Sequence, residues 1–70
     1  MADYRLWRLK KLHQAVDAEL HCLAPDAFEV RYRLNGQTSY ARQCLSRAEA
    51  VADAATKRAE LERDGWVFHW

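Results

Sequence analysis

The 70-residue sequence contains two glycines, one proline and two cysteines. So few glycines exclude the glycine-rich loops that cradle nucleotide phosphates, and no Gly-x-Ser-x-Gly nucleophile segment is present. Cys22 and Cys44 allow at most one disulfide. No apolar run approaches the roughly 18 residues of a membrane span, so we expect no membrane partner. The net charge is +1, which favours neither a polyanion-binding protein nor an acidic one.

The residues that are present indicate one small folded domain over 1–70. Half of them are hydrophobic and 30% are charged, which is a globular composition. A core of this size is marginal unless a disulfide, a metal or a partner chain supports it. The N-terminal residues lack the apolar stretch of a secretory signal, so we expect a cytoplasmic protein with reduced thiols. Self-association is then the remaining means of support.

The clearest local signal is a helix over 47–64. Ser46 and Glu49 have the spacing of a capping box, and no glycine or proline follows before Gly65. Gly65 suits the left-handed position after a helix, where Trp66 would pack back on Leu61. A stripe at helical spacing predicts the buried side of this helix, and it comprises Ala50, Val51, Ala54, Arg58 and Leu61.

Asn35-Gly36 predicts a two-residue hairpin turn between strands at about 27–34 and 38–45. Counting outward from this turn pairs Leu34 with Gln37. The same register gives the further pairs Arg31–Tyr40, Val30–Ala41 and Glu29–Arg42. It places three residues on the apolar face beneath the helix, namely Ser39, Ala41 and Leu45. Cys44 would lie on the opposite, open face, and Cys22 on the apolar one.

The first 24 residues carry two competing patterns. Apolar residues recur at heptad spacing, as in a helix, at Leu6, Leu9, His13, Val16, Leu20 and Leu23. From Val16 to Cys22, however, apolar and charged residues alternate as in a strand. A single helix would place basic residues at its N-terminus and acidic ones near its C-terminus, against the helix dipole. We therefore expect strands at about 4–11 and 15–23.

Turning at 24–27 lets the second and third strands pair antiparallel. Leu20 then faces Val30, and the charged residues oppose one another as Glu19–Arg31, Asp17–Arg33 and His21–Glu29. The fold class expected is α+β, a three- or four-stranded antiparallel β-meander with one C-terminal α-helix packed on one face. An N-terminal helix followed by a β-hairpin and a C-terminal helix stays open, because the turn at 10–14 lacks the usual turn residues.

No residue combination points to catalysis, a cofactor or a metal. His21 and Cys22 are adjacent, so on a strand their side chains point to opposite faces and cannot share a metal ion. His13 and His69 have no partner at ligand spacing. Cys44 on an open face would be a candidate reactive thiol, with only Arg42 as a nearby cation. We expect a protein that is not an enzyme.

An arginine-rich sheet face is the one feature that suggests nucleic acid. In the register above, the open face carries a possible contact set of Arg31, Arg33, Tyr40 and Arg42. A second basic cluster surrounds Trp7, with Arg5, Arg8, Lys10 and Lys11. Carboxylates interrupt the arginines on this face, including Asp17, Glu19 and Glu29, and we expect them to form cross-strand charge pairs. A nucleic-acid-binding module is therefore the second choice.

The aromatic tail is the more informative feature for function. Trp66-Val67-Phe68-His69-Trp70 is too apolar to be left in water. It could fold back along the edge of its own sheet or dock on another chain. We expect a non-enzymatic interaction protein that self-associates, a two-fold dimer being favoured over another protein partner, with Trp66, Phe68 and Trp70 at the interface.

Overall fold

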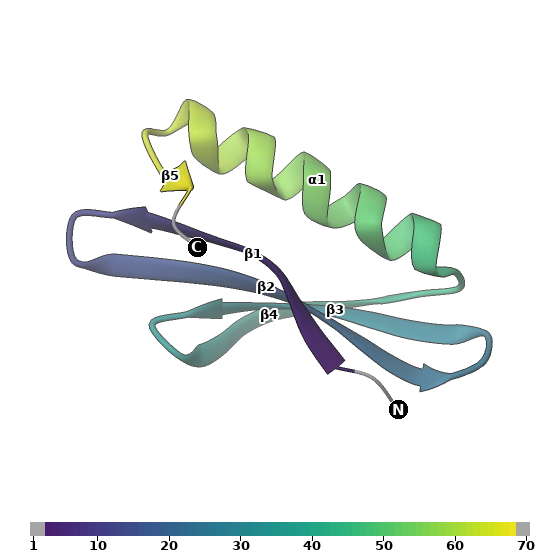
Figure 1. Cartoon of the computed structure of the whole chain (residues 1–70). Helices are drawn as coiled ribbons and strands as arrows, with labels where there is room; N and C mark the ends of the chain where they lie inside the picture. Colours follow the sequence, from purple (N-terminus) through teal and green to yellow (C-terminus); the bar gives the residue numbers. More distant parts are fainter. Residues whose placement is uncertain (1–2, 69–70) are drawn as a thin grey trace.

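The computed structural model describes residues 3–68 of the chain. Its elements, in chain order, are β1 (Asp3–Lys11), β2 (Gln14–Ala24), β3 (Ala27–Leu34), β4 (Gln37–Cys44), α1 (Arg47–Arg63) and β5 (Val67–Phe68). The strands form one antiparallel sheet in the order β4-β3-β2-β1-β5, and α1 lies across one face of it (Figure 1). The expected α+β meander with a C-terminal helix is confirmed, and the alternative with an N-terminal helix is wrong.

Two of the three hairpin turns, β1–β2 and β3–β4, differ in how well their residues suit the turn. At Asn35-Gly36 both residues have positive φ, 52° and 87°, as a type I′ turn requires. Asn35 also joins this tip to β2, since it donates through its backbone N–H to Ala15 and accepts from the Ala15 N–H through its side chain. In the β1–β2 turn Leu12 has a φ of 56°, which a leucine rarely adopts.

The β2–β3 register agrees with the expectation at every pair named above. Leu20 lies opposite Val30, Glu19 opposite Arg31, and Asp17 opposite Arg33. Apolar residues at alternate positions fix this register, because a one-residue slip would carry them all to the polar face. In β1 the pairing with β2 shifts once, at Leu6, and this extra residue packs against the core.

The β3–β4 register differs from the expectation beyond the turn. Leu34 pairs with Gln37 as expected, but a β-bulge at Ser39 moves every later pair by one residue. The observed pairs are Tyr32–Tyr40, Arg31–Ala41, Val30–Arg42, Glu29–Gln43 and Phe28–Cys44. The expected placement of Ala41 and Leu45 on the apolar face is therefore wrong, since Ala41 lies on the open face and Leu45 is 80% exposed. Tyr40, Arg42 and Cys44 are the β4 residues on the side of the helix.

The predicted helix ends are confirmed. At the N-terminus the Ser46 hydroxyl accepts a hydrogen bond from the Glu49 N–H at 3.1 Å. At the C-terminus Gly65 has a φ of 99° and donates to the Glu62 carbonyl, while the Trp66 N–H donates to the Leu61 carbonyl. This bond pair is a Schellman motif, which satisfies the last carbonyls and turns Trp66 back toward the sheet.

Small residues allow the helix to pack closely on the sheet. Ala50 and Ala54 are fully buried, and their short side chains let α1 approach closely enough for the Trp7 indole N–H to donate to the Ala54 carbonyl at 3.1 Å. Val51, expected in the buried stripe, is 42% exposed. The core otherwise consists of sheet residues, mainly Trp7, Leu9, Val16, Ala18, Leu20, Val30, Tyr32 and Cys44.

Candidate functional site

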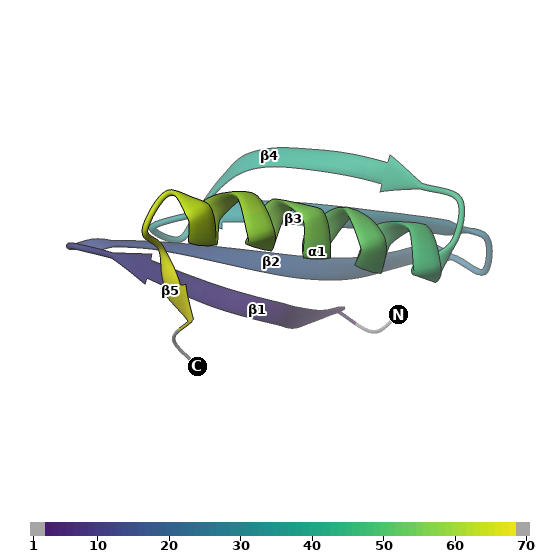
Figure 2. The same cartoon turned by 90° about the horizontal axis from the view of Figure 1, so that it is seen from above.

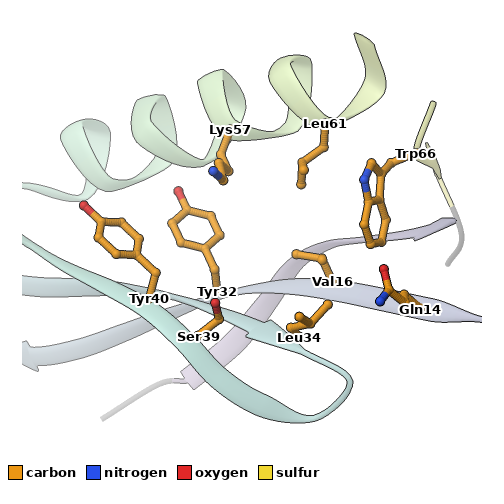
Figure 3. Close-up of a pocket in the computed structure, with 9 residues that line it drawn as sticks. All are labelled: Gln14, Val16, Tyr32, Leu34, Ser39, Tyr40, Lys57, Leu61 and Trp66. Atoms are coloured by element: carbon orange, nitrogen blue, oxygen red, sulfur yellow. The ribbon is translucent and has the colours of Figure 1, made fainter. Parts of the chain in front are cut away.

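An apolar groove lies between the C-terminal half of α1 and the sheet. Its volume is about 240 Å³. The helix contributes Lys57 and Leu61 to its lining, and the turn after the helix contributes Trp66 (Figure 3). The sheet side is the end of β2, β3 and β4 near the Asn35-Gly36 turn. We call this feature the apolar groove, and its complete lining is Gln14, Val16, Tyr32, Leu34, Ser39, Tyr40, Lys57, Leu61 and Trp66.

The chemistry of the apolar groove is that of a docking site for apolar side chains. Aromatic and aliphatic groups supply most of the wall, and its polar side chains are Gln14, Ser39 and Lys57 together with the tyrosine hydroxyls. Two wall residues remain open to water, with Tyr40 56% exposed and Leu34 37% exposed. The Tyr40 ring stacks on Tyr32 at 5.9 Å between centroids, which holds this wall in place.

A polar cluster centred on Asp53 fixes the helix over β3 and β4. The Asp53 carboxylate accepts hydrogen bonds from the Tyr32 hydroxyl and from the Arg42 guanidinium, each at 2.6 Å. Burial raises the pKa of the Tyr32 hydroxyl far above its ordinary value, and the bond to Asp53 raises it further. Such a hydroxyl stays protonated, so the cluster serves as a structural clamp between α1 and the sheet.

Charge pairs cover the open face of the sheet, the face away from α1. Arg8 makes a bidentate contact with Asp17 at 2.6 and 3.0 Å, and Arg31 contacts Glu29. Glu19 lies opposite Arg31 but contacts Arg33 at 3.5 Å and His21 at 3.0 Å. The charges on this face are paired, but not as the expected Glu19–Arg31 and Asp17–Arg33, because Asp17 contacts Arg8 and Glu19 contacts Arg33 instead.

The four-residue set proposed for nucleic acid is not assembled on one face. Arg31 and Arg33 lie on the open face in ion pairs with carboxylates. The bulge at Ser39 turns Tyr40 and Arg42 to the side of α1, where Tyr40 stacks on Tyr32 and Arg42 binds Asp53. The expected common face for these four residues is therefore wrong.

The second basic cluster is likewise divided between faces. Trp7 is buried against α1, and its ring lies 6.1 Å from that of Tyr32. Arg8 is paired with Asp17 on the open face, while the Lys11 ammonium donates to the Asp64 carbonyl at the end of the helix. No exposed aromatic platform surrounded by free cations results among the described residues of β1.

The described part of the aromatic tail lies on its own sheet. Phe68 pairs with Leu9 and Val67 with Lys10, so β5 extends the sheet beside β1. Trp66 packs against the core, and the Arg58 guanidinium lies 4.8 Å from the centre of the Phe68 ring. Phe68 nevertheless remains 50% exposed. Trp70 and His69 lie outside the described residues.

Both cysteines are free thiols, and their expected placement on opposite faces is wrong. Cys22 and Cys44 both pair with Phe28, one from each side, so they lie on the same face with a strand between them. Cys44 is 3% exposed. Burial raises the pKa of its thiol, and the Glu49 carboxylate raises it further, so the reactive thiol considered from the sequence is not formed.

The groove and the Asp53 clamp are the features that sequence reasoning missed. One signal for the clamp was available, since Asp53 falls on the sheet side of the helix at helical spacing from Ala50, where a carboxylate requires a buried partner. The groove carried no comparable signal, because its walls come from four separate elements.

Other kinds of site are not seen in residues 3–68. No group of three or more histidine, cysteine, aspartate or glutamate side chains that could hold a metal ion occurs among them. Within the same residues, no helix is both long and apolar enough to cross a membrane. Searches against protein-family models, curated proteins and solved structures return no match to this chain.

Proposed function

We propose that this chain is a non-enzymatic interaction protein of the cytoplasm that self-associates. The observation that carries the proposal is the continuity between the apolar groove and β4. Ser39 and Tyr40 of β4 line the groove, and the other side of β4 is free of any strand among the described residues. A protein partner can use both, through main-chain bonds to the strand and apolar contacts in the groove.

The size of the groove supports a protein partner over a small-molecule ligand. Pockets for drug-sized ligands have volumes of roughly 300–1,000 Å³ and bury most of the ligand. At about 240 Å³, this groove suits one or two apolar side chains. Exposed apolar residues near the two ends of β4, Leu34 and Leu45, extend the surface that a partner would cover.

The ion pairs on the open face favour a protein partner over nucleic acid. Each phosphate contact requires a cation that is free to replace a counterion. Arg8, Arg31 and Arg33 already contact carboxylates, so binding a phosphate there would require breaking an ion pair.

Sedimentation equilibrium of the full chain tests the proposal. We expect the average mass to rise from monomer toward dimer between low and high micromolar protein concentration. A mass that stays at the monomer value throughout would contradict self-association. A parallel mobility-shift series with single-stranded RNA at increasing salt is expected to show no tight, salt-sensitive complex, and such a complex would favour the nucleic-acid function instead.

A further inference from the structure

The two edges of the sheet differ in whether an additional strand covers them. At the β1 edge, β5 supplies a short extra strand that pairs with Leu9 and Lys10. At the other edge β4 pairs with β3 alone among the described residues, and α1 lies to one side of it (Figure 2). Along β4, alternate residues therefore direct their N–H and C=O groups away from the sheet with no strand to receive them.

The β4 edge also lacks most of the devices that prevent strand addition. Proteins commonly protect an open edge with proline, lysine, an inward charge or a bulge. β4 contains no proline or lysine, and Arg42, its single charged residue, is tied to Asp53 at 2.6 Å. Its bulge lies at Ser39, near the start of the strand, so the residues from Tyr40 to Cys44 keep regular pairing with β3.

We infer that a second copy of this chain pairs with β4, antiparallel and about a two-fold axis at Ala41. In a continuous sheet a two-fold axis must pair residues that point to the same face, so it passes through one residue. An axis at Arg42 would set two guanidinium groups opposite each other. An axis at Ala41 sets a small side chain against itself and places Arg42 opposite Tyr40 of the second copy.

The Ala41 register extends an aromatic stack that is already present. Tyr32 and Tyr40 stack on neighbouring strands with an interplanar angle of 17°. Tyr40 is 56% exposed, so part of its side chain is accessible to a second chain. Arg42 of the second copy keeps its Nη1 contact with its own Asp53, and the plane of its guanidinium group would lie beside this ring as a cation–π contact.

The exposed apolar residues at the two ends of β4 come close together in this dimer. Leu45 follows the end of the strand and is 80% exposed, while the apolar groove lies near its start at Ser39 and Tyr40. Antiparallel pairing brings the end of one β4 beside the start of the other. In the Ala41 register, Leu45 of each copy lies beside Gln37 of the other copy, near the end of β4 whose residues Ser39 and Tyr40 line the groove.

This inference rests on the proposed self-association, and substitutions at Ala41 separate the two. Ala41 is exposed and lies opposite Arg31 on the open face, so a longer side chain does not disturb the core. Ala41→Lys would put two ammonium groups opposite each other at the axis, and we expect the dimer dissociation constant to rise at least about tenfold. Ala41→Thr, a neutral strand-forming residue at the same position, is expected to keep the wild-type constant.

Cysteine cross-linking tests the register directly, in the full chain with Cys22→Ser. Residues opposite each other lie within the Cα separation that a disulfide spans, so Ala41→Cys should give a disulfide dimer on mild oxidation. Gln43→Cys is the matched control, because its two copies would lie four residues apart along the strands, about 13 Å. We expect it to stay unlinked.

Three results would overturn the inference, and they differ in what else they affect. A wild-type chain that is monomeric removes both the inference and the proposed self-association. A dimer that is unchanged by Ala41→Lys removes the β4 interface and leaves self-association standing. Equal cross-linking of Ala41→Cys and Gln43→Cys, or cross-linking of Gln43→Cys alone, removes the two-fold register at Ala41.

Discussion

Leu12 and Gly36 show at the scale of single residues how backbone conformation limits stability. Both occupy the left-handed region, with φ of 56° and 87°, and Leu12 is 90% exposed and packs little. For an L-residue with a side chain this region costs about 1–2 kcal/mol, whereas glycine adopts it freely. The residues of the β1–β2 turn do not favour this conformation by themselves, and the pairing of β1 with β2 stabilises it.

Leu12→Gly should stabilise the protein. We expect the free energy of unfolding to rise by about 0.5–1 kcal/mol in urea denaturation, because glycine removes the strain while its greater freedom in the unfolded chain offsets part of the gain. Gly36→Ala is the matched control, and it should lower the free energy of unfolding. A methyl group there meets no atom within 4 Å, so a loss of stability reports backbone strain alone. An unchanged or lower stability for Leu12→Gly would contradict this account.

The Tyr32–Asp53 bond gives the protein a defined alkaline limit. Folding raises the pKa of Tyr32 above its ordinary value of 10.0, so in the unfolded chain this hydroxyl ionises first. The stabilisation is complete below pH 10 and is lost as the pH rises above it. In Tyr32→Phe we expect a lower free energy of unfolding at neutral pH, by about 1.5 kcal/mol, and a shallower decline above pH 10.

Tyr40→Phe is the control for this pH dependence, because it leaves the Tyr32–Asp53 bond in place. Thermal unfolding midpoints measured from pH 7 to above pH 10 provide the comparison. Equal alkaline slopes for wild type and Tyr32→Phe would show that Tyr32 does not set the limit.

At the scale of elements, the helix is the part most fully encoded by local sequence. Its cap at Ser46, its stop at Gly65 and the return of Trp66 are all specified within a few residues of each end. The choice of buried face was less well specified, because Val51 and Arg58 share the helical spacing of Ala50 and Ala54. Tertiary contacts settle this choice, among them the Trp7 bond to the Ala54 carbonyl and the Asp53 clamp.

Helix-end substitutions should have measurable costs. Ser46→Ala removes the side-chain bond to the Glu49 N–H and should lower the free energy of unfolding by about 0.5–2 kcal/mol. Gly65→Val should cost more than an average surface change, because a β-branched residue resists the φ of 99°. Thermal midpoints equal to wild type for both variants would show that these caps do not stabilise the helix.

The contrast between the two central hairpins explains which strand registers could be predicted. In β2 and β3, apolar and charged residues alternate strictly, so only one register buries all of the apolar ones. From Gln37 to Gln43 the sequence of β4 has no such alternation, and the turn alone suggested a register. The bulge at Ser39 arises where Tyr40 stacks on Tyr32, a contact that no local pattern contains.

The tail is expected to act as an intrachain strand. Phe68→Ala removes the contact with Arg58 and weakens the pairing with Leu9, so the free energy of unfolding should fall by about 0.5–1 kcal/mol. Because the inferred interface lies at the opposite edge, the dimer dissociation constant should stay unchanged. Urea denaturation and sedimentation equilibrium give the two quantities, and a weaker dimer would restore the tail as the interface.

At the scale of the whole molecule, the sequence predicted the layers but not the surfaces. Alternation in β2 and β3, the Asn35-Gly36 turn and the helix caps together predicted a sheet of three or four strands with a helix on one face, and β5 is the additional strand. The position of the helix across the sheet is a tertiary property, set by Ala50, Ala54 and the Asp53 clamp. That position opens the apolar groove and leaves β4 to one side, so neither could be located from the sequence.

Amide hydrogen exchange at two protein concentrations tests most directly whether β4 is the surface that self-associates. At high concentration we predict added protection in β4 around Tyr40–Gln43, at the amides that point away from β3, with unchanged protection in β5. Exchange in β4 that is independent of concentration, or added protection in β5 instead, would contradict the account.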